Sequence, residues 1–296
     1  VYPPPYGGAT VKCELFCKML KNVGIIANRI DIYEASRNKT KIIGILKMCI
    51  KAYKSNNPVV YCLDSKRLRV MVLVIGGIFH ETVAEHPAFE KCMKSVNGVW
   101  VETEGMKENL LKSGFENVEI FPNPKSQIGN CYPQNAQKNK ELKLVYFSQI
   151  SREKGVEEII KLVGLLNNKT EISYKLDFYG HIVPEVKDEF DKFINNSLNV
   201  NYCGIFDSTK SSVYKKLNEY DILLFPTRWK GEGVPGILVE AKMAGVAVIA
   251  SPMNFNKEIV CENMNEGFIL EKEYPQEMLN IIERCYKDRD LLDRMK

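Results

Sequence analysis

The stretch from Glu232 to Glu240, with the sequence EGVPGILVE, restricts the fold of this chain more than any other. It lies between two short apolar runs, Asp221–Pro226 and Val246–Ala250, and each run is typical of a buried strand. The Gly-Val-Pro-Gly segment predicts a loop, and the apolar residues that lead to Glu240 predict a helix. A strand, a glycine-rich loop, a helix and a second strand form a βαβ unit. In such a unit a ligand binds beyond the carboxyl end of the first strand, against the N-terminus of the helix.

The same alternation of strand-like and helix-like segments runs along both halves of the chain. Further strands are predicted at Val59–Leu63, Val70–Ile75, Val99–Val101, Val118–Phe121, Leu144–Phe147, Leu176–Tyr179 and Val200–Tyr202. Helices are predicted at Ala9–Asn22, Lys41–Lys54, Gly105–Lys112, Val156–Leu166, from Pro184 onward, Ser211–Tyr220 and Pro275–Lys296. This pattern indicates an α/β fold with parallel sheets covered by helices.

A polar segment near the middle of the chain divides this pattern into two domains. Lys125–Glu141 is rich in asparagine and glutamine and has no apolar periodicity, which is typical of an interdomain linker. We therefore predict a first domain over residues 1–130, a linker over 131–141 and a second domain over 142–296. A length of 296 residues is enough for two domains of ordinary size.

The cysteine and hydropathy patterns exclude several classes of protein. The nine cysteines form no CxxC pair and no cluster with histidine, so neither a zinc site nor a disulfide framework is expected. A reducing compartment fits this usage better. No apolar run approaches the roughly 20 residues that span a bilayer, and no signal peptide is found. We expect a cytoplasmic protein.

The charge is distributed unevenly. Residues 1–69 carry 13 basic and 4 acidic side chains, and this local charge of +9 exceeds the +4 of the whole chain. A cationic segment favours an anionic partner such as a phosphate group or a membrane surface. Nucleic acid is not expected, because no binding motif accompanies the charge. In Lys41–Lys54, Lys47, Lys51 and Lys54 form one stripe, which fits either a helix on anionic lipid or a covering helix with a solvated face.

Two features of the second domain point to a bound phosphate. Lys154 lies in the loop SREKG after a predicted strand, where its ammonium can reach an anion. The N–H groups of Gly236, Ile237 and Leu238 open a helix, and the helix dipole favours negative charge there. Glu232 and Glu240 would repel a phosphate, so they are better suited to accept hydrogen bonds from hydroxyls. A nucleotide-sugar combines these groups; alternatively, both glutamates are solvated surface residues.

Five motifs in this order resemble one enzyme family. They are PPYGGA, the run from Trp100 to Pro124 that ends VEIFPNP, YFSQISREKGVEEIIKLV, EYDILLFPTRW and EGVPGILVEAKMAGVAVIAS. Together they resemble the retaining GT-B glycosyltransferases called family 4, whose signature is E-x7-E. The resemblance implies an α/β fold of two Rossmann-like domains whose parallel sheets face each other across a cleft. It also implies that a first strand and a terminal crossover helix lie outside the given sequence, because neither pattern is present.

The resemblance also implies roles for individual residues. Glu240 would hold the donor ribose, Glu232 would contact hydroxyls of the donor sugar, and Lys154 would pair with the diphosphate. The loop and helix start that receive the diphosphate would be Gly233, Val234, Pro235, Gly236 and Ile237, with Gly8 packed near the same phosphates. His80 would face the transferred sugar. We therefore predict Glu232, Lys154 and His80 as catalytic residues, and we predict no metal site and no cofactor.

One position departs from the family pattern. The family has an arginine in the motif GRL-x3-KG, and this chain has Gln149 there. A neutral side chain cannot stabilise a leaving diphosphate by charge, although Arg152 is three residues away. Both Gln149 and Arg152 are counted among the predicted donor-binding residues.

The implied activity is transfer of a sugar from a nucleotide-diphosphate sugar to a hydroxyl acceptor with retention at the anomeric carbon. The setting would be bacterial surface polysaccharide or glycolipid synthesis, with a lipid-linked saccharide among the candidate acceptors. The basic N-terminal domain would then contact the inner face of the membrane. Two alternatives stay open, a non-catalytic nucleotide-binding module of the same fold and a nucleotide-sugar epimerase.

Overall fold

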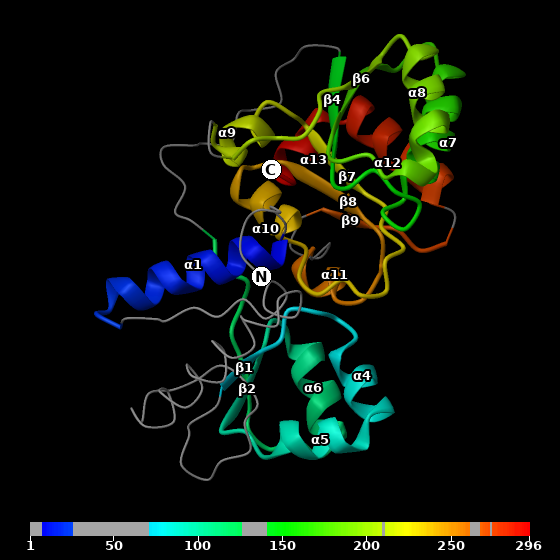
Figure 1. The fold of residues 1–296 in the computed structure, drawn as a ribbon. Coiled ribbons are helices and arrows are strands. Elements are labelled where there is room, and N and C mark those ends of the chain that lie inside the picture. Colours follow the sequence, from blue (N-terminus) through cyan, green and yellow to red (C-terminus); the bar gives the residue numbers. More distant parts are fainter. Residues whose placement is uncertain (1–7, 26–70, 126–140, 209–210, 261–266, 273) are drawn as a thin grey trace. The chain divides into compact units, whose positions relative to one another are not determined.

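The computed structural model describes residues 8–25, 71–125, 141–208, 211–260, 267–272 and 274–296. The chain separates into two compact units, Val1–Ser126 and Gln127–Lys296, which we call the N-terminal and the C-terminal unit (Figure 1). The predicted elements Lys41–Lys54 and Val59–Leu63 lie outside the described residues, as does the predicted linker except for its last residue, Glu141.

The N-terminal unit contains a parallel sheet of three described strands in the order β1-β2-β3. Its elements are α1 (Gly8–Asn22), β1 (Met71–Leu73), α4 (Phe79–Glu85), α5 (Pro87–Lys94), β2 (Gly98–Val101), α6 (Glu104–Lys112) and β3 (Val118–Ile120). The three predicted strands that fall in the described part of this unit are confirmed within one to two residues at their ends. The helices α4 and α5 were not predicted. Pro87 begins α5 at a position where its missing N–H has no cost.

Helix α1 packs on this sheet through an aromatic contact and an ion pair. The Phe16 ring meets the rings of Trp100 and Phe121 edge-on, with centroids 6.2 and 5.6 Å apart. Lys12 forms an ion pair with Glu102, which follows β2, and the two side chains are only 6% and 2% exposed. A buried ion pair fixes the register of two elements, because separating the charges would leave either one unpaired away from water.

The C-terminal unit contains a parallel sheet of six strands in the order β6-β5-β4-β7-β8-β9. The strands are β4 (Glu141–Phe147), β5 (Ser173–Tyr179), β6 (Val200–Tyr202), β7 (Ile222–Phe225), β8 (Ala247–Ala250) and β9 (Phe268–Ile269). The helices are α7 (Val156–Asn167), the 3₁₀ helix η1 (Pro184–Val186), α8 (Lys187–Asn195), α9 (Val213–Leu217), α10 (Gly236–Met243), α11 (Asn256–Ile259), α12 (Tyr274–Lys287) and α13 (Arg289–Arg294). This order is that of a Rossmann fold, in which the direction of winding reverses between the first and fourth strands, here β4 and β7.

Both faces of this sheet are covered, which explains why its central strands are continuous apolar runs. Along β7, Ile222 and Leu224 pack toward α7 and α12, whereas Leu223 and Phe225 pack toward α9 and α10. Figure 1 shows α9 and α10 on one side of the sheet and α7, α8 and α12 on the other. None of the helices in the described ranges is both long and apolar enough to cross a membrane.

Several boundaries in the C-terminal unit differ from the prediction. The helix expected from Pro184 begins as the 3₁₀ helix η1, and the α-helix starts at Lys187. The helix expected over Ser211–Tyr220 is limited to Val213–Leu217. The C-terminal segment forms two helices, because Asp288 is extended and its side chain accepts the Leu291 N–H at 2.9 Å, which caps α13.

Candidate functional site

The loops that follow β4 and β7 contact each other at the point where the winding reverses. We call Ser148–Gly155 the first loop and Pro226–Pro235 the second loop. The Arg228 N–H donates to the Glu153 carbonyl at 2.7 Å, and the Thr227 hydroxyl donates to the same oxygen at 3.3 Å. In open α/β sheets, ligands bind at the carboxyl ends of the strands at this reversal. The C-terminal unit therefore has its candidate site on these two loops.

An ion pair joins the two loops across this position. Lys154 of the first loop pairs with Glu232 of the second loop, and the two side chains are 17% and 16% exposed. The Lys154 ammonium also lies 5.6 Å from the centre of the Trp229 ring, within the range of a cation–π contact. Both predicted residues are thus brought together, in an arrangement that sequence spacing did not reveal.

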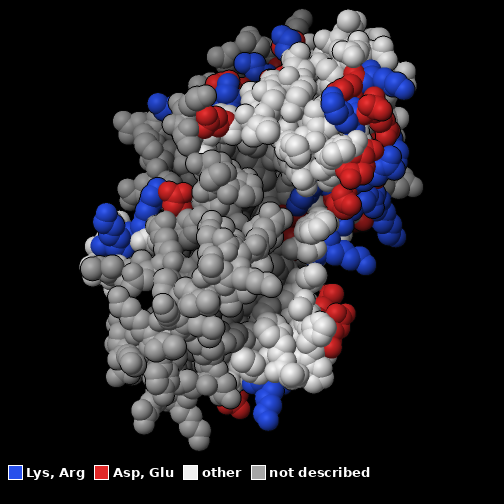
Figure 2. Space-filling view, in the orientation of Figure 1, with Lys and Arg blue, Asp and Glu red and all other residues white. Residues whose placement is uncertain are grey.

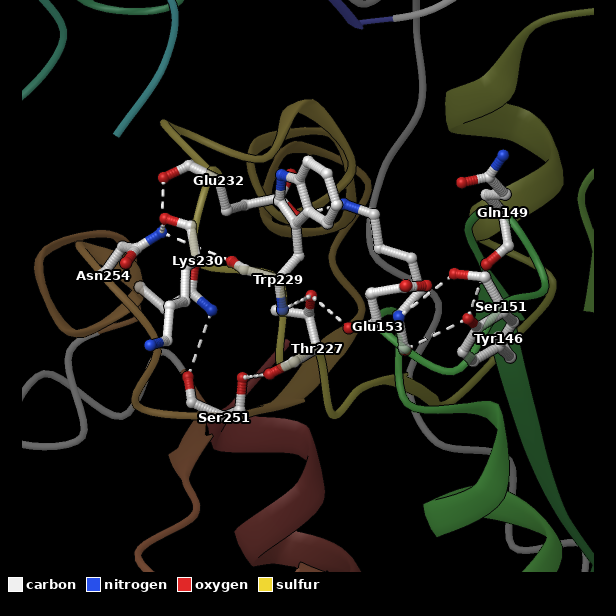
Figure 3. Close-up of polar contacts among 12 residues, drawn as sticks. Tyr146, Gln149, Ser151, Glu153, Thr227, Trp229, Lys230, Glu232, Ser251 and Asn254 are labelled. Atoms are coloured by element: carbon white, nitrogen blue, oxygen red, sulfur yellow. Dashed lines mark hydrogen bonds and ion pairs between the residues drawn. The ribbon is translucent and has the colours of Figure 1, made fainter. Parts of the chain in front are cut away.

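The first loop is held by a buried tyrosine. The Tyr146 hydroxyl contacts the carbonyl oxygens of Gln149 and Lys154 at 2.8 and 3.1 Å, and the Lys154 N–H donates to Ser151 Oγ at 3.3 Å (Figure 3). Tyr146 has no exposed surface. Burial raises its pKa above the ordinary tyrosine value, so the hydroxyl keeps its proton and remains a donor. The buried Tyr146 hydroxyl therefore holds the backbone that carries the Lys154 side chain.

The second loop is tied to the strand ends through buried polar side chains. Thr227, Ser251 and Asn256 are completely buried. Ser251 Oγ donates to the Thr227 carbonyl at 2.6 Å, and Asn256 Nδ2 donates to the Ser251 carbonyl at 3.1 Å. Further along the loop, Asn254 Nδ2 donates to the carbonyls of Lys230 and Glu232, each at 2.7 Å (Figure 3).

Helix α10 begins directly after the second loop. Gly233, Val234 and Pro235 are buried, and Pro235 precedes the first helical residue, Gly236. The Leu238 N–H is already bonded to the Pro235 carbonyl at 3.1 Å, so the expectation that it is available to a ligand is wrong. Gly236 and Ile237 supply the N–H groups that open the helix, where the dipole favours an anion.

Glu240 lies one turn into α10 and is half-buried. Burial, and to a smaller extent the Glu240 carboxylate, raise the pKa of Tyr214 in α9 to about 12. Tyr214 therefore stays neutral and is close enough to sense the charge of Glu240. Because Gly236 and Glu240 are four residues apart in one helix, they share a face of α10.

The other predicted residues lie in different surroundings. Gln149 is exposed. The Arg152 guanidinium, 59% exposed, pairs with Glu157 at 3.1 Å and with Glu189 at 3.5 Å, so it lies against carboxylates of α7 and α8. Gly8 is the first residue of α1 in the N-terminal unit. His80, in α4 of the same unit, lines a small pocket with Val74, Gly77, Phe79, Val101, Met106 and Leu110.

Three supporting residues were not identified from the sequence, namely Tyr146, Arg228 and Asn254. Arg228 donates Nε and a terminal nitrogen to Glu158 Oε1 at 3.1 and 2.8 Å, and its guanidinium lies 4.4 Å from the centre of the Tyr274 ring. This anchors the second loop to α7 and α12. Arg228 and Asn254 could have been identified from their positions in the sequence, because both closely follow predicted strands. Side chains that follow strand ends are placed to serve a site.

The parallel sheets of the two units, each covered by helices, define an α/β fold of the GT-B type. Residues 132–296, more than half of the chain, match the family described as Glycosyl transferases group 1. The chain belongs to this family.

Known proteins similar to the chain include glycosyltransferases. The capsular polysaccharide biosynthesis glycosyltransferase CapH of Staphylococcus aureus is 24% identical over 189 residues, which are 62% of this chain and 52% of CapH. WaaG, a glycosyltransferase involved in lipopolysaccharide biosynthesis, aligns over 99% of this chain and 90% of its own, with a TM-score of 0.68 and 18% identity. A Staphylococcus aureus TarM variant in complex with UDP, fondaparinux and alpha-GlcNAc-glycerol aligns over 78% of this chain and 46% of its own, with a TM-score of 0.59 and 20% identity. The chain spans about half the length of the curated relatives it matches.

Proposed function

We propose that the chain is a retaining glycosyltransferase that moves a sugar from a nucleotide-diphosphate sugar to a hydroxyl group. The observation that carries this proposal is the Lys154–Glu232 ion pair at the switch point, on the loop that leads directly into α10. A cation and helix N–H groups suit a diphosphate, and a carboxylate suits sugar hydroxyls. In the structure these two groups are paired with each other.

In the proposed reaction, Lys154 and Glu232 release each other, and each binds a different part of the donor. Its diphosphate takes Lys154 and the N–H groups of Gly236 and Ile237, and the released Glu232 accepts hydrogen bonds from the sugar. Glu240, on the same face of α10, receives the ribose hydroxyls. The bond from the anomeric carbon to the diphosphate breaks, the acceptor oxygen bonds to that carbon on the same face, and the acceptor proton passes to the departing diphosphate. Groups held in place stabilise the charge that develops on the diphosphate.

The setting of the reaction is proposed from the relatives. CapH belongs by its name to capsule synthesis and WaaG to lipopolysaccharide synthesis, and TarM was solved with UDP. We infer a role in bacterial surface polysaccharide or glycolipid synthesis, with transfer of a hexose in the cytoplasm. A uridine nucleotide is the first donor to test. Lys154 and the helix N-terminus supply the positive charge, and no metal ion is required.

A thermal-shift screen of nucleotide-sugars tests the proposal, because a ligand of the native state raises the melting temperature by mass action. The panel contains uridine, guanosine, adenosine and thymidine diphosphate sugars, with free nucleoside diphosphates alongside and EDTA in duplicate wells. We expect at least one donor to raise Tm with and without EDTA, and the same donor to be consumed when an acceptor is added. No shift with any member of the panel would contradict the proposal.

Two observations favour an alternative in which the nucleotide binds without transfer. Gln149 is neutral, and Arg152 is engaged with Glu157 and Glu189. Binding of a nucleoside diphosphate with no donor loss across a panel of acceptors would support this module. Loss of the donor without an acceptor-linked product would instead support the epimerase.

Contact with a membrane is a separate proposal. On the face shown in Figure 2, the described basic and acidic side chains are intermixed, so the proposal rests on the charge of residues 1–69. We expect the chain to co-sediment with vesicles of anionic lipid at low salt, and we expect Lys47→Glu, Lys51→Glu and Lys54→Glu together to abolish this. Vesicles of neutral lipid are the control. A wild-type chain that stays in the supernatant at low salt would end the proposal.

A further inference from the structure

Asn254 has an unusual backbone in the loop between β8 and α11. Its φ is +47°, and it is the one residue other than glycine with a positive φ in the described parts of the chain. This conformation is disfavoured for residues with a side chain, and asparagine tolerates it better than most. Such a backbone conformation persists in a folded protein only where the surrounding contacts hold it.

The contacts of the Asn254 side chain converge on a single turn. Its Nδ2 donates at 2.7 Å to the carbonyls of Lys230 and Glu232, and the Trp229 carbonyl is a weaker third contact at 3.5 Å. An amide nitrogen has two hydrogens, which match the two short contacts. The same turn is closed by the Glu232 N–H, which lies 3.4 Å from the Trp229 carbonyl. Asn254 therefore gathers the backbone from Trp229 to Glu232.

The other contacts of this turn come from Lys154, which pairs with the Glu232 carboxylate and lies over the Trp229 ring, and from the Trp229 N–H, which donates to Thr227 Oγ1 at 3.2 Å. The side chains of Trp229 and Lys230 are exposed, and Trp229 keeps 46% of its surface accessible. The buried bonds of Thr227, Ser251 and Asn256 hold only the base of the loop. The first loop, by contrast, is held by the fully buried Tyr146. The Glu232 carbonyl is thus bound by an exposed amide that comes from a different loop.

We propose that Asn254 is a positioning residue that sets where Glu232 meets the donor sugar. The inference rests on the proposed function for its catalytic consequence. Asn254 holds the backbone of Glu232, and Lys154 holds its carboxylate. When a diphosphate takes Lys154, the amide of Asn254 remains as the restraint that keeps Glu232 in place. Nucleotide binding, which uses Lys154 and the start of α10, does not need this restraint.

Two substitutions distinguish the effect of the Asn254 side-chain amide from the effect of its backbone conformation. Asn254→Gly keeps a residue that adopts positive φ readily and removes the donor. Asn254→Asp keeps the shape but replaces the donor with a carboxylate that can only accept. Asn168→Gly, at an exposed position after α7, is the matched control.

The first measurement does not require activity. In a Trp100→Phe background, Trp229 is the sole tryptophan of the chain, because the sequence contains two. We expect Asn254→Gly and Asn254→Asp to increase acrylamide quenching of Trp229, and Asn168→Gly to leave it unchanged. Unchanged quenching in both Asn254 variants would overturn the inference. Since this result does not depend on turnover, it separates failure of the inference from failure of the proposed function.

The second measurement tests the connection to Glu232. We expect each Asn254 variant to lower kcat about tenfold or more, since small misplacements of reacting groups are costly, while the Kd for the nucleoside diphosphate changes less than twofold. In a Glu232→Gln background the same substitutions are expected to lower kcat little further, because residues that act as a unit are not additive. A full tenfold loss in both backgrounds would overturn the positioning role.

Discussion

Lys154→Ala is expected to lower the rate of sugar transfer by about 10²- to 10³-fold, the usual effect of removing one preorganised group that stabilises developing charge. The substitution removes the cation proposed to receive the diphosphate and leaves Glu232, which is only 16% exposed, without its partner. Glu232→Ala is expected to cause a comparable loss by removing the acceptor for the sugar hydroxyls. The measurements are initial rates with a saturating acceptor and the donor identified by thermal shift.

Controls for this experiment come from the same unit. Lys187→Ala removes a lysine of α8 that is 58% exposed and pairs with Asp191 at 2.5 Å, so it changes the charge without touching the two loops. We expect it to retain wild-type rates. Circular dichroism and Tm should show that the Lys154 and Glu232 variants remain folded. Wild-type turnover in both the Lys154 and the Glu232 variants would show that the assignment of the site is wrong.

Gly155→Ala is expected to damage both stability and activity. Gly155 has a φ of +82°, and an added Cβ would overlap the Pro226 carbonyl oxygen and lie 2.8 Å from its carbonyl carbon. Those atoms are backbone at the start of the second loop and cannot rotate away. We expect the free energy of unfolding to fall by about 2–4 kcal/mol, since strain and steric overlap combine. The rate of sugar transfer should also fall, because the added methyl group pushes apart the two loops that carry Lys154 and Glu232.

Gly164→Ala provides the comparison for that substitution. Gly164 lies within α7, and no atom comes within 4 Å of a Cβ added there. Alanine has the higher helix propensity, so we expect unchanged activity and a gain of about 0.5–1 kcal/mol. Urea denaturation with matched m-values measures both variants. A Gly155→Ala chain as stable as wild type would show that the contact between the loops is not close-packed.

Much of the fold could be predicted because burial on both faces leaves a visible pattern. The run Ile222–Phe225 is entirely apolar since alternate residues face two different helix layers. The ends of elements were harder to predict. The break at Asp288 depends on one side chain capping α13, and in the sequence alone the charged tail continues a helical pattern past it.

In the site, only residues whose type and position after a strand end suggest a function could be predicted from the sequence. Lys154 and Glu232 stand out because a lysine and a glutamate follow strands next to glycine-rich turns. Their pairing was not predictable, since 78 residues separate them. Tyr146 and Asn254 were missed for a related reason. Each acts on backbone carbonyls of another segment, and carbonyls carry no signature in the sequence.

The Lys154–Glu232 ion pair has a consequence for selectivity among phosphate compounds. In the proposed reaction, inorganic phosphate or a free nucleotide must compete with Glu232 for Lys154 and then leaves the half-buried carboxylate without a partner, which costs free energy. The complete donor supplies a phosphate for the lysine and hydroxyls for the glutamate together. The proposed enzyme would thus resist occupation by abundant cellular anions, and its own nucleotide product would depart more easily once the sugar has left.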